Sequence, residues 1–333
     1  EYSVKNSLIR VPKLIESVQE AGMTSIALTD DMSLFSAIKF YQKAISAGIK
    51  PIIGAKITVT FELGNYDILL LCQNHKGYLN LSELISKAYL NEQGISSVSV
   101  TEEQLISHQE GLIMVATAVS SDIAQLLLSN EHNHAETKAI GWKSIFNDRY
   151  YISVQRTSRS LDENLLNLTI DLGLQLEIPV VATNDVQFLK KNDYEAHEAR
   201  ICIAQGGLLD DARRLKNFSE TQYLKTPSEM SDLFSDFPNI LKNTVELSKR
   251  CNLHFELFEK NYLPIFPTPK GKTISEFFHE ESMSGLKERL KGISVNEEIY
   301  YERLNFELSV ILEMDYPGYF LIVSDFIRWA KEN

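Results

Sequence analysis

The first 205 residues alternate between short apolar segments and amphipathic segments, and this alternation restricts the possible folds more than any other feature. Strands that alternate with helices indicate βαβ units and a largely parallel sheet. At least six such units fit before residue 205, which favours a closed or nearly closed barrel over a small open sheet. The expected strands are 25–30, 50–61, 66–73, 111–117, 149–155 and 178–185, and the expected helices are 11–22, 34–48, 77–90, 101–108, 121–129, 134–146 and 161–177.

The sequence changes character after residue 205. A loop-like stretch, 206–218, precedes two expected helices, 226–234 and 238–252. Three prolines at 264, 267 and 269 then predict a semi-rigid extended linker and a domain boundary. Residues 274–333 are expected to be helical and to end in apolar side chains without a full set of partners. We therefore expect the chain to be a fragment that continues past Asn333.

Net charge and cysteine content limit the function classes. The formal net charge of −12 disfavours nucleic-acid binding by this chain alone, because that binding depends on Lys and Arg. Cys72, Cys202 and Cys251 form no CxxC motif, which argues against a disulfide framework or a zinc knuckle and fits a reducing cytoplasm. No apolar run reaches the roughly 20 residues that a membrane-spanning helix needs, so we expect no membrane partner.

Polar residues lie at the C-terminal ends of three of the expected strands, at 29–31, 155–156 and 184–185. In a barrel, these strand ends would build the functional site. Carboxylates at Asp30, Asp31 and Asp185 could hold divalent metal ions for phosphoester hydrolysis. Equally, they could cap helices and accept hydrogen bonds from loop amides, and the residues alone favour this second interpretation.

Other candidate groups have simpler interpretations. His132 and His134 have an HxH spacing but lie in a polar turn, which predicts a solvated loop. His197 could reach the strand ends, although a surface or helix-packing role is favoured. The basic cluster of Arg213, Arg214 and Lys216 is expected to be solvated. The sequence contains no P-loop, GxGxxG, GxSxG or HExxH motif.

Long motifs spread over the whole chain resemble the bacterial replicative DNA polymerase III alpha subunits, which are C-family polymerases. They include LIRVPKLIESVQEAGMTSIALTD, PVVATNDVQFL, EAHEARICI, QYLKTPSEMSDLF and MDYPGYFLIVSDFIRWAKEN. The resemblance implies an α/β fold: a polymerase-and-histidinol-phosphatase (PHP) domain with a distorted seven-stranded, TIM-like βα barrel. It places that domain at 1–262, with the barrel to about 205 and a helical extension at 206–262. A linker at 263–273 and the mostly helical start of the palm domain, 274–333, follow.

The same resemblance assigns each metal-ligand position of an intact PHP site to a residue of this chain. The family's opening HxH pair would lie before Glu1. Asp185 keeps the family residue, and Asp31 and Asp67 replace histidines by carboxylates. The other positions carry residues different from the family's Asp, Glu, Cys, Glu and His, namely Asn6, Lys56, Ala118, Ser153 and Gln187.

Lys56 is the decisive difference from that pattern. An ammonium group has three donors and no acceptor, so it cannot ligate a metal ion. We expect Lys56 to form an ion pair with Asp31 or Asp185 and to replace the charge of the metal. Breaking such a pair, if it is buried, costs about 3–5 kcal/mol. The resemblance thus implies a vestigial metal site, no catalytic residue and no tightly bound cofactor in this chain.

For the full-length protein, the resemblance implies DNA-directed DNA synthesis with Mg²⁺ in the cytoplasm, at the nucleoid. It implies DNA, a sliding clamp and clamp-loader subunits as partners. The PHP domain would be a scaffold that docks the proofreading exonuclease, and this chain alone would be inactive. Asp325 is expected to lie in an apolar helical environment, without a catalytic role. Two alternatives are a PHP-type metal-dependent phosphoesterase or 3′–5′ exonuclease, and an interaction domain unrelated to DNA, which the palm-like segment disfavours.

Overall fold

The computed structural model describes residues 2–3, 6–61, 64–90, 98–211, 213–214, 216–257 and 264–333. The chain divides into two compact units, Glu1–Phe255 and Glu256–Asn333. The boundary expected between residues 262 and 263 lies outside the described residues. Within the described part of the chain, no helix is long and apolar enough to cross a membrane.

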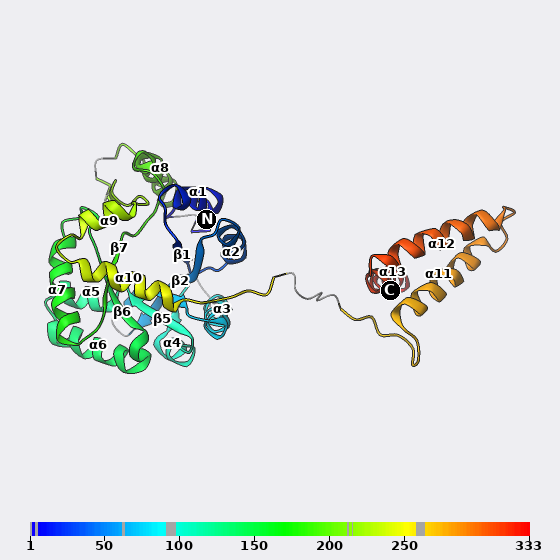
Figure 1. The fold of residues 1–333 in the computed structure, drawn as a ribbon, viewed down its shortest axis with the longest axis horizontal. Coiled ribbons are helices and arrows are strands. Elements are labelled where there is room, and N and C mark those ends of the chain that lie inside the picture. Colours follow the sequence, from blue (N-terminus) through cyan, green and yellow to red (C-terminus); the bar gives the residue numbers. More distant parts are fainter. Residues whose placement is uncertain are drawn as a thin grey trace. The chain divides into compact units, whose positions relative to one another are not determined.

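A curled sheet of seven strands forms the centre of the first unit (Figure 1). Its order is β1-β2-β3-β5-β6-β7, and β4 pairs with β2 outside this path. The strands are β1 (Ser25–Asp31), β2 (Lys50–Phe61), β3 (Gly64–Cys72), β4 (Val100–Thr101), β5 (Leu112–Ala116), β6 (Tyr150–Gln155) and β7 (Val180–Thr183).

The sheet is largely parallel, as expected, but the direction of one strand, β3, makes it mixed. β3 runs antiparallel to both β2 and β5, whereas the other neighbouring pairs are parallel. The reason is the short β2–β3 connection, across which Phe61 pairs with Gly64. So short a connection permits only an antiparallel pair, because a parallel crossover needs a dozen or more residues.

Ten α-helices of the described part of this unit lie around the curled sheet (Figure 1). The predicted capping box of α4 is present, because Thr101 and Gln104 exchange both hydrogen bonds. The helices are α1 (Val11–Glu20), α2 (Ala37–Ser46), α3 (His75–Leu90), α4 (Glu102–Ser107), α5 (Asp122–Leu128), α6 (His132–Phe146), α7 (Asp162–Gln175), α8 (Tyr194–Gln205), α9 (Pro227–Leu233) and α10 (Pro238–Arg250).

Helix α10 joins the helical extension to the sheet. Leu247 and Cys251, at its C-terminal end, belong to one buried apolar cluster with residues of β2, β3, β5, β6 and β7. Asn243 also donates a hydrogen bond from Nδ2 to the carbonyl of Val180, at 2.9 Å. The extension after residue 205 is therefore part of the barrel's packing.

The sheet is a half-barrel with a seam between its two end strands, β1 and β7, which do not pair with each other in the described structure. The chain that precedes α1 bridges this seam. On one side, Ser3 Oγ accepts a hydrogen bond from the backbone N–H of Asp31, at 3.0 Å. On the other, the N–H of Leu8 donates to the carbonyl of Gln187, at 3.0 Å. Residues 6–8 are called the seam strap below.

The second unit contains the helices α11 (Ile274–Leu290), α12 (Glu297–Glu313) and α13 (Pro317–Glu332). Phe278, Leu308 and Leu321 form its small core. As expected from the sequence, apolar side chains of α13 remain exposed, and Trp329 is 67% exposed. Asp325 is also exposed and forms an ion pair with Arg328 at 2.7 Å, so the expected apolar environment of Asp325 is wrong.

Candidate functional site

The centre of the site is an ion pair between neighbouring strands. The parallel register of β1 and β2 places Asp31 opposite Lys56. Lys56 Nζ lies 2.7 Å from Asp31 Oδ1, and the two side chains are 28% and 30% exposed. The predicted pair with Asp31 is thus present. Its partial exposure makes the pair weaker than a buried one.

Three carboxylates act on the Lys56 ammonium group. Burial acts to lower the pKa of Lys56, but the carboxylates of Asp31, Asp67 and Asp185 outweigh it, so the pKa lies above its usual value. Lys56 therefore stays charged at neutral pH. The site has a positive charge among these three carboxylates.

Hydrogen-bond donors complete the environment of Asp31 and Asp67. Asn6 Nδ2 donates to Asp31 Oδ2 at 3.0 Å, so each oxygen of that carboxylate has a partner. Thr58 Oγ1 donates to Asp67 Oδ1 at 2.8 Å. Asn6 thus presents a donor at the position that the sequence resemblance assigns to a carboxylate ligand.

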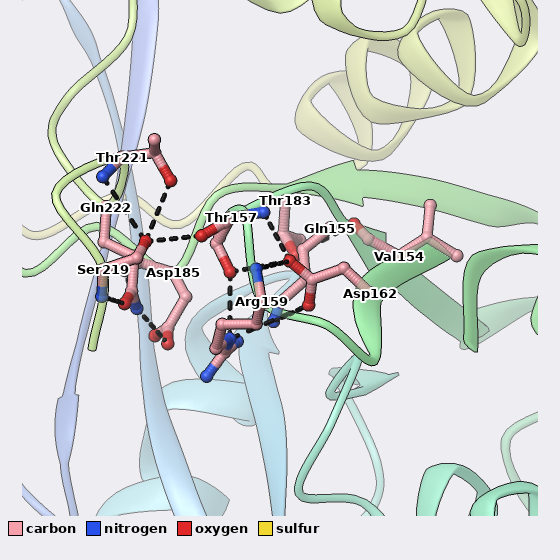
Figure 2. Close-up of polar contacts among 10 residues, drawn as sticks. All are labelled: Val154, Gln155, Thr157, Arg159, Asp162, Thr183, Asp185, Ser219, Thr221 and Gln222. Atoms are coloured by element: carbon pink, nitrogen blue, oxygen red, sulfur yellow. Dashed lines mark hydrogen bonds and ion pairs between the residues drawn. The ribbon is translucent and has the colours of Figure 1, made fainter. Parts of the chain in front are cut away.

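Asp185 is surrounded in the same way (Figure 2). Gln187 Nε2 donates to Asp185 Oδ1 at 2.8 Å. Gln222 Nε2 donates to Asp185 Oδ2 at 2.9 Å, and Figure 2 shows this second contact. The backbone of Asp185 is left-handed, with φ of 47°. Aspartate tolerates this conformation better than most residues. Each described carboxylate of the site therefore accepts a hydrogen bond from a neutral donor.

The remaining two predicted positions lie just after β5, at Ala118, and within β6, at Ser153. Ala118 is buried, and Ser153 Oγ donates to the carbonyl of Ala116 at 2.8 Å. Among the residues that the structure describes, no three or more His, Cys, Asp and Glu side chains are grouped so that they could hold a metal ion.

A second polar network, which the sequence did not predict, joins the loops after β6 and β7 (Figure 2). Asp162 is buried and accepts hydrogen bonds from the N–H and Oγ1 of Thr157, at 2.6 and 2.9 Å. Ser219 Oγ donates to the carbonyl of Thr157, and Gln222, three residues later, reaches Asp185. Residues 219–222 thus tie the two loops together. The only sequence signal for Asp162 was an acidic residue at the start of an expected helix.

The three polar strand ends converge only in part. Gln155 Nε2 lies 3.4 Å from Asp162 Oδ1, within the second network. Arg156 instead pairs with Glu163 and Asp236 on the surface. Asn184 donates to the carbonyl of Tyr223 and not to a side chain near Lys56. Of these strand-end residues, Asp31 and Asp185 are the two whose carboxylates act on the Lys56 ammonium group.

His197 is fully buried on α8, packed against the rings of Phe188 and Phe218 at centroid distances of 5.3 and 4.8 Å. The predicted packing role is confirmed. Its Nε2 lies 2.6 Å from the carbonyl of Asn6, which assigns the proton to Nε2 because a carbonyl can only accept. Nδ1 has no hydrogen-bond partner within the described structure. The site therefore requires neutral His197.

The pH dependence of stability should reflect this requirement. Burial, the largest cause, lowers the pKa of His197; Arg200 lowers it further, whereas the Asn6 carbonyl, Glu198 and Asp185 raise it. Because the folded-state pKa lies below the unfolded value of about 6.5, the contribution to stability is complete above that pH. It is lost as the pH falls from there through the folded-state pKa.

A His197→Gln variant should therefore lose stability less steeply below pH of about 6.5 than the unmodified protein. The measurement is denaturant unfolding at a series of pH values. The matched control is His134→Gln, because the side chain of His134 is 75% exposed, whereas that of His197 is buried. Equal slopes for the His197 variant and the unmodified protein would contradict the prediction.

Three other sequence-based candidates are located by the structure. His134 is exposed beside Glu131, as predicted, but it lies in the first turn of α6 and not in a loop. Arg213 is exposed, but Arg214 forms an ion pair with Glu198 at 2.6 Å, with side chains only 10% and 5% exposed. The solvated-loop prediction is thus wrong for Arg214, because α8 offers it a buried carboxylate that the sequence does not reveal.

All three cysteines are free and buried. Burial raises the pKa of the Cys251 thiol to about 11 and that of Cys72 well above its usual value. A reactive cysteine needs an accessible thiolate, which Cys72 and Cys251 lack at neutral pH. Neither of these two thiols is a candidate nucleophile.

Comparison with known proteins agrees with the fold and the sequence motifs. The PHP domain family matches residues 1–157, and the family described as "Bacterial DNA polymerase III alpha NTPase domain" matches residues 276–333. The DNA polymerase III subunit alpha of Pseudomonas fluorescens is 43% identical over 349 residues, that of Pseudomonas aeruginosa 44% over 344 and that of Escherichia coli K12 38% over 343. Each alignment covers 100% of this chain and 29% of the relative. The chain therefore belongs to the family of DNA polymerase III alpha subunits and carries a PHP domain.

Proposed function

We propose that this chain is the N-terminal region of the catalytic subunit of a replicative DNA polymerase. The full-length protein would carry out DNA-directed DNA synthesis with Mg²⁺, together with DNA, a sliding clamp and clamp-loader subunits, in the cytoplasm at the nucleoid. Relatives of that name align with the whole chain, which supports this proposal. The PHP domain would extend to residue 262, a linker would occupy 263–273, and the palm would begin at 274.

We further propose that the PHP domain has no catalytic metal ion and acts as a scaffold. The observation that carries this proposal is the Lys56 ammonium group. It extends from β2 and lies 2.7 Å from Asp31, at the position where the family resemblance places a carboxylate ligand. Neutral donors on Asp31, Asp67 and Asp185 support the same interpretation. A carboxylate that is already paired with a cation gains less from a metal ion. The scaffold would dock the proofreading exonuclease.

Metal content tests the scaffold proposal directly. The full-length protein is incubated with Zn²⁺, Mn²⁺ and Mg²⁺, desalted, and analysed by elemental mass spectrometry, with phosphoesterase activity assayed in parallel. We expect much less than one ion per chain, and no phosphoesterase activity.

The second candidate function, a PHP-type phosphoesterase or 3′–5′ exonuclease, predicts two or three retained ions per chain, as expected for multi-metal hydrolysis. An activity that also disappears in an Asp185→Asn variant would establish that alternative. Co-purification with a proofreading exonuclease tests the docking proposal separately, because a scaffold without metal could still fail to bind it.

A further inference from the structure

The seam strap is held from two opposite sides by side chains that belong to different parts of the barrel. Towards β1, Asn6 Nδ2 bonds Asp31. Towards α8, the carbonyls of Asn6 and Ser7 accept hydrogen bonds from His197 Nε2, at 2.6 Å, and Arg200 Nη1, at 2.8 Å. Two successive strap carbonyls are thus fixed by one helix, and the strap side chain is fixed by a strand end.

The strap also bonds the chain that follows β7. The Leu8 N–H and the Ser7 Oγ both donate to the carbonyl of Gln187, at 3.0 Å each. Gln187 follows β7, and its side chain bonds Asp185. The strap is therefore the link between the Asp31 side and the Asp185 side of the site.

Lys56 controls the geometry of this link through Asp31. It binds Oδ1 and leaves Oδ2 directed to Asn6. Without the ammonium group, the Asp31 carboxylate would lose its fixed orientation and its charge would be uncompensated, so solvent would compete with Asn6 for it. The effect of losing the ammonium group should therefore appear at the strap before it appears in the interior strands.

We propose that the seam strap is a closing device of the half-barrel, and that Lys56 is its positioning residue, acting through Asp31. The strap and the seam open together when either the Lys56–Asp31 side or the α8 side is weakened. The inference rests on the proposed role of Lys56 as the charge that replaces a metal ion. It adds that the same charge controls the position of the seam strap.

The test is hydrogen–deuterium exchange of the full-length protein, read in peptides that contain the Leu8 amide and in peptides from β5. Lys56→Met removes the charge and keeps a similar stem. We expect about tenfold faster exchange at the strap, the equivalent of one lost charge-assisted hydrogen bond, and unchanged exchange in β5. Arg200→Met, which weakens the α8 side, should give the same pattern.

Lys13→Met is the matched control, because Lys13 forms an exposed ion pair with Glu16 on the neighbouring α1. It should leave the strap unchanged. Unchanged strap exchange in Lys56→Met, or an equal rise in the strap and β5, would overturn the proposal. Metal content measured on the same samples separates this outcome from failure of the scaffold proposal, which would appear as bound metal in the unmodified protein.

Discussion

A Lys56→Glu variant is expected to be less stable by about 3 kcal/mol and to recover stability when divalent cations are added. The substitution removes the ion pair and places a new carboxylate opposite Asp31, within the electrostatic reach of Asp67 and Asp185. Uncompensated like charges at a partly buried site account for the loss. A divalent cation that binds only the folded variant would restore stability by mass action.

Hydrogen exchange of the β5 amides in the full-length protein measures this effect, because a multi-domain protein need not unfold in two states. MnCl₂ should slow exchange in Lys56→Glu. It should have no effect on Lys56→Met, which loses the pair without gaining a carboxylate. Equal protection of the unmodified protein by MnCl₂ would mean that a cation already binds beside Lys56, and the interpretation of Lys56 as its replacement would fail.

Gly77→Ala should destabilise the barrel by about 3 kcal/mol, at the upper end of the range for overpacked positions. Gly77 lies in the first turn of α3, directly against Gly111 before β5. A Cβ at Gly77 would lie 1.9 Å from the carbonyl oxygen of Gly111. That oxygen belongs to the backbone, and Gly111 itself has φ of 71°, so neither chain can yield without displacing α3 or β5.

Gly141→Ala is the matched control for this prediction. Gly141 also lies in a helix, α6, but an added Cβ there would meet nothing within 4 Å. It should therefore stabilise α6 by about 0.5–1 kcal/mol, the difference in helix propensity between the two residues. Exchange of the β5 amides separates the two cases: faster in Gly77→Ala, unchanged or slower in Gly141→Ala. Equal rates in both variants would show that α3 is free to move away from Gly111.

The sequence predicted the positions of the main strands but not all of their directions. Alternation of apolar segments locates an element, whereas the direction of β3 follows from the short connection at Phe61 and Gly64. The two-residue strand β4 was missed, because so short a segment has no periodicity of its own. The closure of the seam by residues 6–8 depends on contacts with residues more than 170 positions away, which no local pattern encodes.

The sequence predicted the part of the candidate site in which a residue type excludes metal ligation. An ammonium at position 56 cannot ligate metal, and the β1–β2 register then makes Asp31 its nearest partner. Gln222, Thr58 and Arg214 could not be predicted. Their roles arise from one strand and two loops that meet their partners in the folded chain, where they supply donors to carboxylates on other elements.

The Lys56 ammonium group is covalently part of β2, so it is present beside Asp31 in one copy per chain under all conditions. A metal ion in that position would follow the free concentration of the cation, and its occupancy would fall with chelation or depletion. The charge that positions Asp31 and, through it, Asn6 is instead supplied at synthesis. Shortage of divalent metal cannot remove it, and competing cations gain no advantage from displacing it.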